Sequence, residues 1–373
     1  TMLAPTGEVP AINDSHRGLF PVKILRDGAE SFGKPVVYAI LRNLFGEKKR
    51  GDESLPQYTS RHMPASGFSV MRTNWSPDAL YMTVNYGPEA GFHSHFDLLD
   101  FEAYAFGKPL AIDAGIGLTY DDPLYNPWYR SSKAHNMVAV NDSNIERAGI
   151  QGENIKWGST NSLEFFAGEH RGYQRFGVLH RRQIAFVKPS YWFILDDLSC
   201  TRKGDTLSWY FHSPETLVPS EAGFVSTSAP GIRILPVGQN FTTRSGKGMA
   251  ASTKERIPGK VEEIPWIRFD QTSFRDSVHQ FSILLAPFLK QEDKHSAEKI
   301  SDRHYVVKST ASADHLYFTS GKYIDGTIET DGIFVLIKLR SDGVTTYAVV
   351  DGTYLNYRGK NLWKSATAAS AEG

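Results

Sequence analysis

Apolar side chains recur with helical spacing near the start of the chain. The positions i, i+3, i+4 and i+7 are occupied by the apolar residues Val37, Ile40, Leu41 and Leu44. Such a spacing places side chains on one face of an α-helix. Pro35 suits the first turn of a helix, and Gly46 suits its end. The pattern predicts helical structure within residues 16–45. The charged residues 47–54 that follow are typical of a linker or of a solvated surface loop.

From about residue 66 the periodicity changes to that of strands. Short apolar runs are separated by turns rich in Gly, Pro and Asp. The runs are Gly67–Arg72, Ala79–Val84, Phe101–Phe106, Pro109–Asp113, Tyr191–Asp196, Leu207–His212 and Gln280–Leu285. Gly107 and Lys108 would join two of them as a hairpin. Many short strands with such turns predict a mainly β protein, built on a large antiparallel β-sandwich over residues 64–290.

A second change in composition lies at the polar residues Gln291–Lys294. Further apolar runs follow it, and Ser341–Gly343 has the composition of a hairpin turn. We therefore expect a smaller C-terminal β-unit over residues 291–373. Its small polar residues at 365–370 predict a frayed tail. The helical segment before the sandwich would occupy residues 1–63.

Charge and composition narrow the range of functions. Lys plus Arg and Asp plus Glu number 41 each, so the formal net charge is zero, whereas nucleic-acid-binding proteins usually carry a basic excess. No apolar run approaches the ~20 residues of a transmembrane helix. The single cysteine, Cys200, excludes an internal disulfide. We expect no nucleic-acid partner and no membrane span. The first residues, Thr1–Pro5, lack the charged and apolar regions of a signal peptide.

The candidate chemistry lies in three short stretches between residues 93 and 136. On an extended segment, His93 and His95 would place both imidazoles on one face. Asp113 and His135 follow them. Two histidines, an aspartate and an open position suit Zn²⁺, Mn²⁺ or another divalent ion. One His-x-His can also arise by chance in a chain with 12 histidines, so the surrounding residues must decide.

The residues around these histidines form three blocks. The blocks are Gly91–Phe101, Gly107–Gly115 and Trp128–Val138. They read His-x-His-x-Asp, then a strand ending in Asp-x-Gly, then Ala-His-Asn. In this order they resemble the heparinase II/III-like polysaccharide lyases, a group that includes oligoalginate lyases and glycosaminoglycan lyases. A weaker similarity covers Val178–Arg182 together with Leu195–Asp197. The resemblance extends over about residues 66–215.

The resemblance implies an (α/α) toroid before the sandwich, of which only the last one or two helices would fit in residues 1–63. Asn13 and Asp14 are similar to the stretch near the end of that toroid. In the family the toroid supplies a catalytic Tyr and an Asn or His that neutralises the substrate carboxylate, and neither can be placed here. We therefore expect an upstream helical domain as the partner that completes the cleft.

For function, the resemblance implies a lyase that cleaves a uronic-acid-containing polysaccharide or oligosaccharide, of the alginate or glycosaminoglycan type, by β-elimination. It implies that His93 acts on the substrate carboxylate or in proton transfer. It also implies that His95, Asp113 and His135 hold a supporting divalent metal, zinc above all. Tyr120 is the candidate acid/base tyrosine, because it lies near the place where related lyases carry theirs.

Neighbouring side chains have alternative roles. Tyr125 and Tyr129 compete with Tyr120 for the acid/base role, or they bind the anionic substrate. Arg130 either activates a tyrosine or positions the substrate. Asp97 is expected to support a metal ligand or to lie in a turn. A place in the core or at its rim is expected for His180 and His212.

Two other functions stay open. A cupin-like metal enzyme also carries His-x-His on a β-sandwich, but cupins have a Glu soon after it, where this chain has Leu99 and Asp100. A non-catalytic carbohydrate-binding sandwich would suit the 12% of aromatic residues, yet it needs no convergent His and Asp. For a polysaccharide lyase we expect a secreted or periplasmic protein, and a homodimer is compatible with the sequence.

Overall fold

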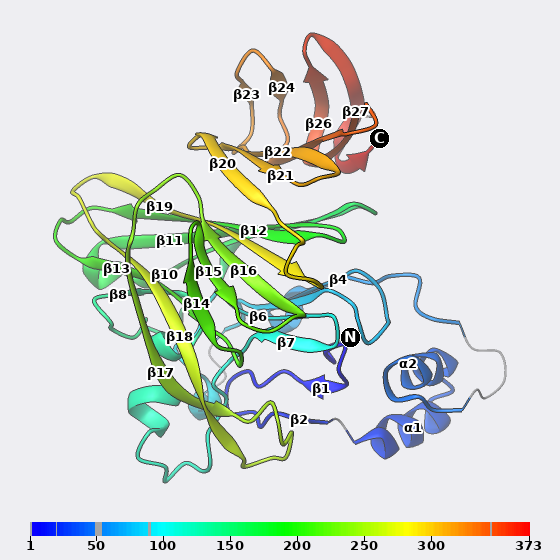
Figure 1. Ribbon diagram of the computed structural model, residues 1–373, viewed down its shortest axis with the longest axis vertical. Coiled ribbons are helices and arrows are strands. Elements are labelled where there is room, and N and C mark those ends of the chain that lie inside the picture. The colour runs from blue at the N-terminus through cyan, green and yellow to red at the C-terminus, as the bar shows by residue number, and fades with distance from the viewer. Residues whose placement is uncertain (1, 20, 49–53, 89–90, 344) are drawn as a thin grey trace.

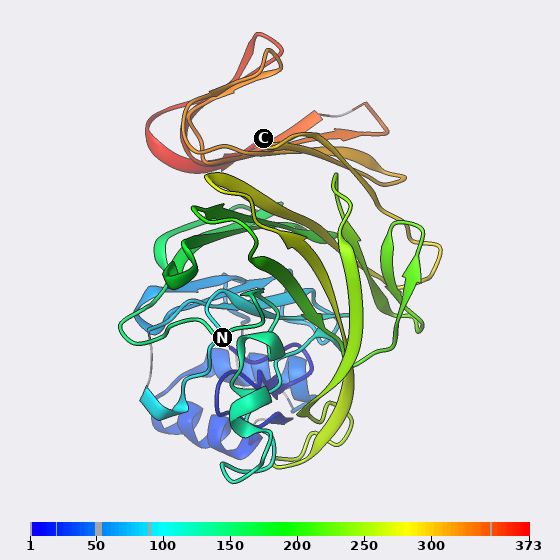
Figure 2. The same ribbon diagram turned by 90° about the vertical axis from the view of Figure 1, so that its left-hand side faces the viewer.

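Three stacked layers of antiparallel strands form most of the molecule, as the computed structural model shows (Figures 1 and 2). The structure describes residues 2–19, 21–48, 54–88, 91–343 and 345–373. A C-terminal sheet lies above an eight-stranded central sheet, and the N-terminal strands lie below it. The mainly β class predicted from the sequence is therefore confirmed. Among the described residues, no helix is long and apolar enough to cross a membrane.

The N-terminal segment contains two short strands and two helices. They are β1 (Glu8–Val9), β2 (Gly18–Leu19), α1 (Val22–Ser31) and α2 (Pro35–Phe45). Pro35 opens α2, and Gly46 ends it in the left-handed conformation at φ +68°, as the sequence predicted. The helical structure is not continuous over residues 16–45, because β2 precedes it and a turn separates the helices. Of the predicted charged loop, residues 49–53 lie outside the described residues.

The lowest layer begins with a five-stranded meander. Its strands are β3 (Arg61–Met63), β4 (Phe68–Arg72), β5 (Tyr81–Asn85), β6 (Asp100–Ala105) and β7 (Lys108–Ala111), paired in that order. The predicted hairpin joins β6 to β7, but its turn is formed by Phe106 and Gly107, which both have positive φ, and Lys108 already belongs to β7. Two consecutive positive φ angles match the right-handed twist of the strands that they connect.

A second group of strands forms the central sheet. The pairing order is β14 (Leu217–Ser220), β15 (Gly223–Ser226), β16 (Gly231–Pro236), β19 (Ser277–Phe288), β12 (Tyr191–Cys200), β11 (Val178–Val187), β10 (Leu163–Tyr173) and β9 (Glu153–Ser159). A separate four-stranded sheet pairs β17 (Thr242–Ala251), β18 (Val261–Thr272), β13 (Thr206–His212) and β8 (Val138–Val140). Together with the meander, this sheet covers the lower face of the central sheet.

The C-terminal sheet contains the last eight strands. They are β20 (Ser296–Ser301), β21 (His304–Lys308), β22 (Ser312–Phe318), β23 (Tyr323–Ile324), β24 (Ile328–Thr330), β25 (Phe334–Arg340), β26 (Thr345–Tyr357) and β27 (Lys360–Glu372). The turn predicted at Ser341–Gly343 lies between β25 and β26. The prediction of a frayed tail at 365–370 is wrong, because these residues belong to β27, which pairs with β26.

Alternating side chains of the central sheet enter two different cores. Phe166 and Ile194 point into the lower core, which they share with residues of the meander and of the four-stranded sheet. Phe165 and Phe193 point into the upper core and pack against the C-terminal sheet. Because successive side chains on a strand point to opposite faces, apolar residues at consecutive positions of these strands bury both faces of the sheet. Short helical turns complete the fold: η1 (Pro64–Ser66), η2 (Gly91–His93), η3 (Tyr125–Tyr129), η4 (Ser132–Ala134) and η5 (Gln174–Phe176).

Candidate functional site

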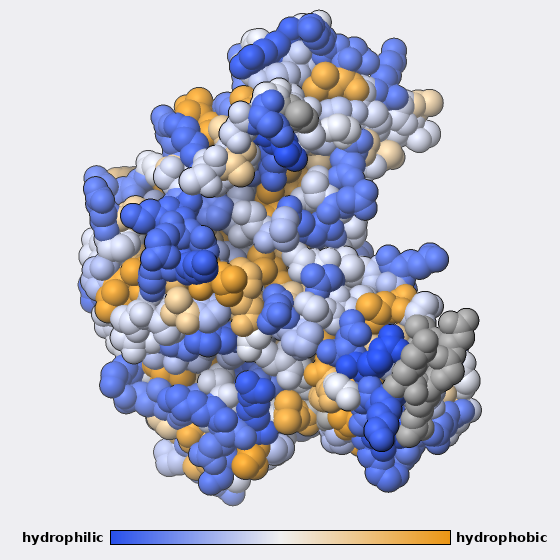
Figure 3. Space-filling view, turned by 45° about the vertical axis from the view of Figure 1, so that its right-hand side comes forward, coloured by the Kyte–Doolittle hydropathy of each residue, from blue (hydrophilic) through white to orange (hydrophobic). Residues whose placement is uncertain are grey.

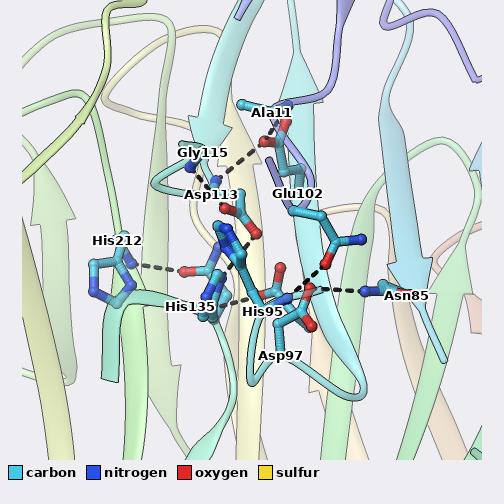
Figure 4. A network of polar contacts seen from close by, with 12 residues as sticks. Ala11, Asn85, His95, Asp97, Glu102, Asp113, Gly115, His135 and His212 are labelled. Carbon is cyan, nitrogen blue, oxygen red and sulfur yellow. Dashed lines mark hydrogen bonds and ion pairs between the residues drawn. The ribbon is translucent and has the colours of Figure 1, made fainter. Parts of the chain in front are cut away.

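Three buried side chains converge below the meander. His95, Asp113 and His135 each offer a ligand atom, and these atoms all lie within 4.8 Å of one another (Figure 4). Asp113 follows β7, and His135 follows η4. His135 Nδ1 lies 2.9 Å from Asp113 Oδ2. Among the described residues, His95 Nδ1 and His135 Nε2 are buried without a hydrogen-bond partner. Two lone imidazole nitrogens beside a carboxylate fit a divalent metal ion such as zinc.

The segment that carries His93 and His95 is not a strand. Residues 91–93 form the turn η2, and the residues after it are irregular up to β6. The expected placement of both imidazoles on one strand face is therefore wrong. The His95 side chain is fully buried, whereas the His93 side chain is 68% exposed.

The carboxylate of Asp14 joins the two histidines instead. Its Oδ1 lies 3.0 Å from His95 Nε2, and its Oδ2 lies 3.0 Å from His93 Nδ1. The Tyr125 hydroxyl donates to the same carboxylate at 2.9 Å, and Asn13 Oδ1 accepts the His95 backbone N–H at 3.0 Å. Burial favours the neutral form of Asp14, but the hydrogen bonds outweigh it and lower the pKa of this carboxyl.

Asp14 is the main residue whose place in the site the sequence did not reveal. It lies 81 residues before its partner His95, so no local spacing connects them. The resemblance of Asn13 and Asp14 to the end of a toroid was the available signal. It pointed to the right stretch without giving either side chain a role.

The exposed end of this arrangement carries the predicted acid/base residues. The Tyr120 hydroxyl lies 3.1 Å from His93 Nδ1, and the Tyr120 ring lies 5.4 Å from that of Tyr125. Tyr120 is 54% exposed. Burial and the Asp14 carboxylate raise the pKa of Tyr125 to about 12. The structure thus brings His93, Tyr120 and Tyr125 together around Asp14, and only Tyr120 of the two tyrosines is open to solvent.

Two further predicted residues lie beside this group in different surroundings. The Arg130 guanidinium donates to the Ser94 carbonyl from Nε at 3.2 Å and from Nη2 at 3.0 Å, so it holds the backbone between the two histidines. Tyr129 is only 1% exposed and packs in a small apolar cluster with Ala114 and Ala134. The structure does not bring the Tyr129 ring to the exposed side of the site.

A network of buried carboxylates surrounds the three convergent residues. Burial raises the pKa of Asp113 to about 7 and, with Asp113 beside it, raises that of Asp100 well above its usual range. Asp97, which accepts a hydrogen bond from Asn85 at 2.8 Å, adds a further negative charge nearby (Figure 4). This concentration of buried acid groups favours a cation.

The N-terminal segment is fixed to this network by Glu102. One carboxylate oxygen accepts the backbone N–H groups of Ala11 and Asp113, both at 3.1 Å. Arg17 pairs with the same carboxylate at 2.7 Å, and both side chains are fully buried. The residues that carry Asp14 are therefore bound to the sheet on either side of it.

The Asn of the Ala-His-Asn block ties three strands together. Asn136 Nδ2 donates to the carbonyl oxygens of Phe101 at 2.8 Å and Ile112 at 3.0 Å, and its Oδ1 accepts the His212 N–H at 2.7 Å. His212 is buried in the core, where burial and the nearby His135 lower its pKa to about 3.

The weaker sequence block forms a buried brace. His180 Nε2 lies 2.8 Å from Asp196 Oδ1, and Arg182 pairs with the same carboxylate at 2.8 Å. Arg182 Nη1 also donates to the carbonyl oxygens of Leu99 at 2.6 Å and Asn136 at 2.8 Å. These two carbonyls are close in sequence to His95 and His135, so the brace supports the segments that carry them.

Comparison with known proteins gives a consistent result. The family model described as "Heparinase II/III-like, C-terminal" matches residues 56–274, more than half of the chain. A heparin-sulfate lyase of Bacteroides stercoris is 31% identical over 294 residues, which cover 77% of this chain and 40% of that protein. A heparin-sulfate lyase of Pedobacter heparinus is 24% identical over 144 residues, covering 38% of this chain and 21% of that protein. The matched regions thus cover less than half the length of these relatives.

Solved structures share the fold. A heparan sulfate lyase from Pedobacter heparinus matches 97% of this chain and 50% of its own, with a TM-score of 0.71 and 16% identity. A heparinase III gene product matches 100% of this chain and 50% of its own, with a TM-score of 0.69 and 18% identity.

Proposed function

The chain belongs to the family of heparinase II/III-like C-terminal domains, and on this basis we propose that it is part of a lyase that cleaves a glycosaminoglycan by β-elimination. The observation that carries the proposal is the contact of Tyr120 and His93 at the exposed end of the Asp14 bridge. Both similar curated proteins are named heparin-sulfate lyases, which favours a glycosaminoglycan over alginate. The family match likewise favours a lyase over a cupin-like enzyme or a non-catalytic binding sandwich.

The reaction requires a base for the C5 proton of a uronate and an acid for the departing O4 oxygen. With its Nδ1–H donated to Asp14, His93 would present the lone pair of Nε2 to the substrate. His93 Nε2 takes the C5 proton, the C5–H electrons form the C4–C5 double bond, and the C4–O4 bond breaks. Tyr120 then gives its proton to O4.

The same contact allows the site to reset. After elimination, His93 is protonated at both nitrogens and Tyr120 is a phenolate. Because the Tyr120 oxygen lies 3.1 Å from His93 Nδ1, the Nδ1 proton can pass to it directly. The proton that remains on Nε2 is then lost to solvent while Nδ1 takes one up, which restores the starting tautomer. A carboxylate-neutralising group is still needed at the uronate, and no such group is assigned within this chain.

We propose that His95, Asp113 and His135 hold a divalent ion, with zinc as the expected metal. The support is the pair of buried imidazole nitrogens without partners and the surplus of buried carboxylates. When bound, the ion would offset this negative charge and fix the three segments relative to one another. His95 would thereby hold Asp14, and Asp14 holds His93.

We also propose that a helical domain preceding this chain completes the cleft and supplies the missing group. The lengths of the relatives support this, because the chain covers about half of the matched structures. We also propose a secreted or periplasmic location, since a long anionic polymer does not reach the cytoplasm unaided.

The proposal is tested by incubating the protein, with its preceding domain, with heparan sulfate, chondroitin sulfate and alginate. Each cleavage creates an unsaturated uronate whose conjugated double bond absorbs ultraviolet light. We expect absorbance to rise with a glycosaminoglycan. Activity on alginate alone would overturn the glycosaminoglycan assignment, and no product from any of the three would overturn the lyase assignment.

A further inference from the structure

A polar cavity of about 380 Å³ lies outside the site described above and shares no residue with it. Its walls come from residues 57–60 before β3, from the turn between β9 and β10, and from residues 370–372 of β27. Figure 3 shows the molecule hollowed on this side, between the C-terminal sheet and the part that carries the helices. The volume is within the range of about 300–1,000 Å³ that is usual for small-molecule sites.

Two charged side chains of the cavity are almost completely buried. Lys188 Nζ donates to Glu164 Oε1 and to the Thr160 carbonyl, both at 2.7 Å, and the Lys188 and Glu164 side chains are 10% and 1% exposed. Glu164 Oε2 is also buried, and no described residue makes a hydrogen bond to it. Burial raises the pKa of Glu164, although Lys188 and the hydroxyls of Ser60 and Ser159 act against it. The Oε2 oxygen therefore has capacity to accept a further hydrogen bond.

The rest of the wall offers neutral polar groups and one aromatic face. The hydroxyl and amide side chains are Gln57, Thr59, Asn161 and Ser370. Tyr58 is 41% exposed, its ring lies 6.2 Å from that of Trp75 in a T-shaped arrangement, and the Arg61 guanidinium lies 5.1 Å from its ring centroid. An exposed ring of this kind can pack against the C–H face of a sugar.

The charges of the cavity disfavour an anion. Glu164 and Glu372 both line it, and Lys188 is already paired with Glu164. A ligand must instead donate a hydrogen bond to a carboxylate and exchange further hydrogen bonds with hydroxyls and amides. The alternating hydroxyl groups of an uncharged sugar meet both conditions.

We propose that this cavity binds a neutral pyranose unit of a carbohydrate. Glu164 Oε2 accepts a hydrogen bond from a sugar hydroxyl, and Tyr58 packs against the sugar ring. This site differs in chemistry from the His93 site, where the proposed substrate is an anionic uronate. The inference does not rest on the lyase proposal, so either one can fail while the other holds.

Calorimetric titration of the full chain tests the inference. The probes are the methyl glycosides of glucose, galactose, mannose and N-acetylglucosamine, with methyl glucuronide as the anionic comparison. We expect at least one neutral glycoside to bind in the millimolar range and the glucuronide not to bind. Glu164→Gln should weaken the binding about tenfold or more. The matched control, Glu298→Gln, removes an exposed carboxylate on β20 and should leave binding unchanged.

A second pair of variants keeps the test independent of the buried glutamate. Tyr58→Ala should abolish measurable binding, whereas Tyr58→Phe should retain it because the ring remains. The inference is overturned if no neutral glycoside binds the unmodified chain. It is equally overturned if binding survives both Glu164→Gln and Tyr58→Ala, or if the glucuronide binds as tightly as the neutral glycosides.

Discussion

His93 and His95 share one acceptor, because the two oxygens of the Asp14 carboxylate each lie 3.0 Å from one of the two rings. The His95 imidazole is buried and is itself a candidate metal ligand, whereas the His93 imidazole is exposed. Asp14 is therefore a positioning residue, because it holds the exposed His93 ring at a fixed place relative to the buried His95 ring.

Replacing Asp14 with Asn tests whether this carboxylate positions His93 for catalysis. We expect Asp14→Asn to lower kcat on the order of 10²-fold, with little change in KM, because His93 loses the carboxylate that orients its ring. Steady-state kinetics with the lyase substrate checks this. Asp121→Asn, a change at an exposed residue of the Tyr120 loop, should have no effect. An Asp14→Asn enzyme with unchanged kcat would remove Asp14 from the mechanism.

Removal of the Tyr120 hydroxyl should also act on turnover. Tyr120→Phe is expected to lower kcat by a factor on the order of 10²–10⁴ with little change in KM, since the proton for O4 is lost. His93→Ala should lower kcat similarly and leave the metal content intact. Tyr354→Phe in the C-terminal sheet is the matched control. Near-normal turnover in Tyr120→Phe would move the role to Tyr125, whose hydroxyl is engaged by Asp14.

Metal content and stability should change together. We expect about one equivalent of zinc by elemental analysis of the purified protein, and a lower Tm after treatment with a chelator. At a free zinc concentration of about 1,000 times Kd, the ion would add ~4 kcal/mol to the free energy of unfolding. His95→Ala should lose both the metal and the chelator response, whereas His315→Ala, in the C-terminal sheet, should keep them. A metal-free protein with an unchanged Tm in chelator contradicts the prediction.

The buried brace should contribute more to the free energy of unfolding than an exposed ion pair does. Arg182→Met leaves the Asp196 carboxylate without its cation and two backbone carbonyls without a donor. We expect the free energy of unfolding to fall by about 3–5 kcal/mol in a denaturant titration. Arg340→Met, which breaks an exposed pair with Asp342, should cost less than about 1 kcal/mol. Equal losses of unfolding free energy in the two variants would contradict this prediction.

The same brace predicts a loss of stability in acid. Burial opposes ionisation of Asp196, but Arg182 and His180 lower its pKa to about 2, below its ordinary value of 3.8. The unfolded chain therefore binds the proton more tightly, so this contribution is present above about pH 4 and is lost as the pH falls towards 2. Its size is about 2 kcal/mol. Asp196→Asn should remove this part of the pH dependence. If the free energy of unfolding of that variant falls between about pH 4 and about pH 2 as steeply as that of the unmodified protein, the prediction is wrong.

The sequence predicted the elements whose determinants are local. Pro35 and Gly46 set the ends of α2 through their own backbone preferences. The consecutive apolar residues around Ile194 indicated a strand, because a sheet buried on both faces needs no polar alternation. These features depend on neighbours within a few positions of the chain.

Features that depend on distant partners were missed. The histidines at 93 and 95 meet at Asp14 through a folded turn, which period-2 spacing cannot represent. Residues 365–370 looked like a tail because Ser, Ala and Thr carry little strand signal, yet they belong to β27 and its pairing with β26. In both cases the deciding contacts come from residues that sequence patterns leave unconnected.

The central sheet has a practical consequence for anyone who shortens the protein. Because one of its faces is covered by the C-terminal sheet, a chain that stops after Phe288 would present Phe165 and Phe193 to water. Such a chain would carry a broad exposed apolar surface and would tend to aggregate when expressed. The last 80 or so residues therefore serve as a solubilising cover that recombinant versions should retain.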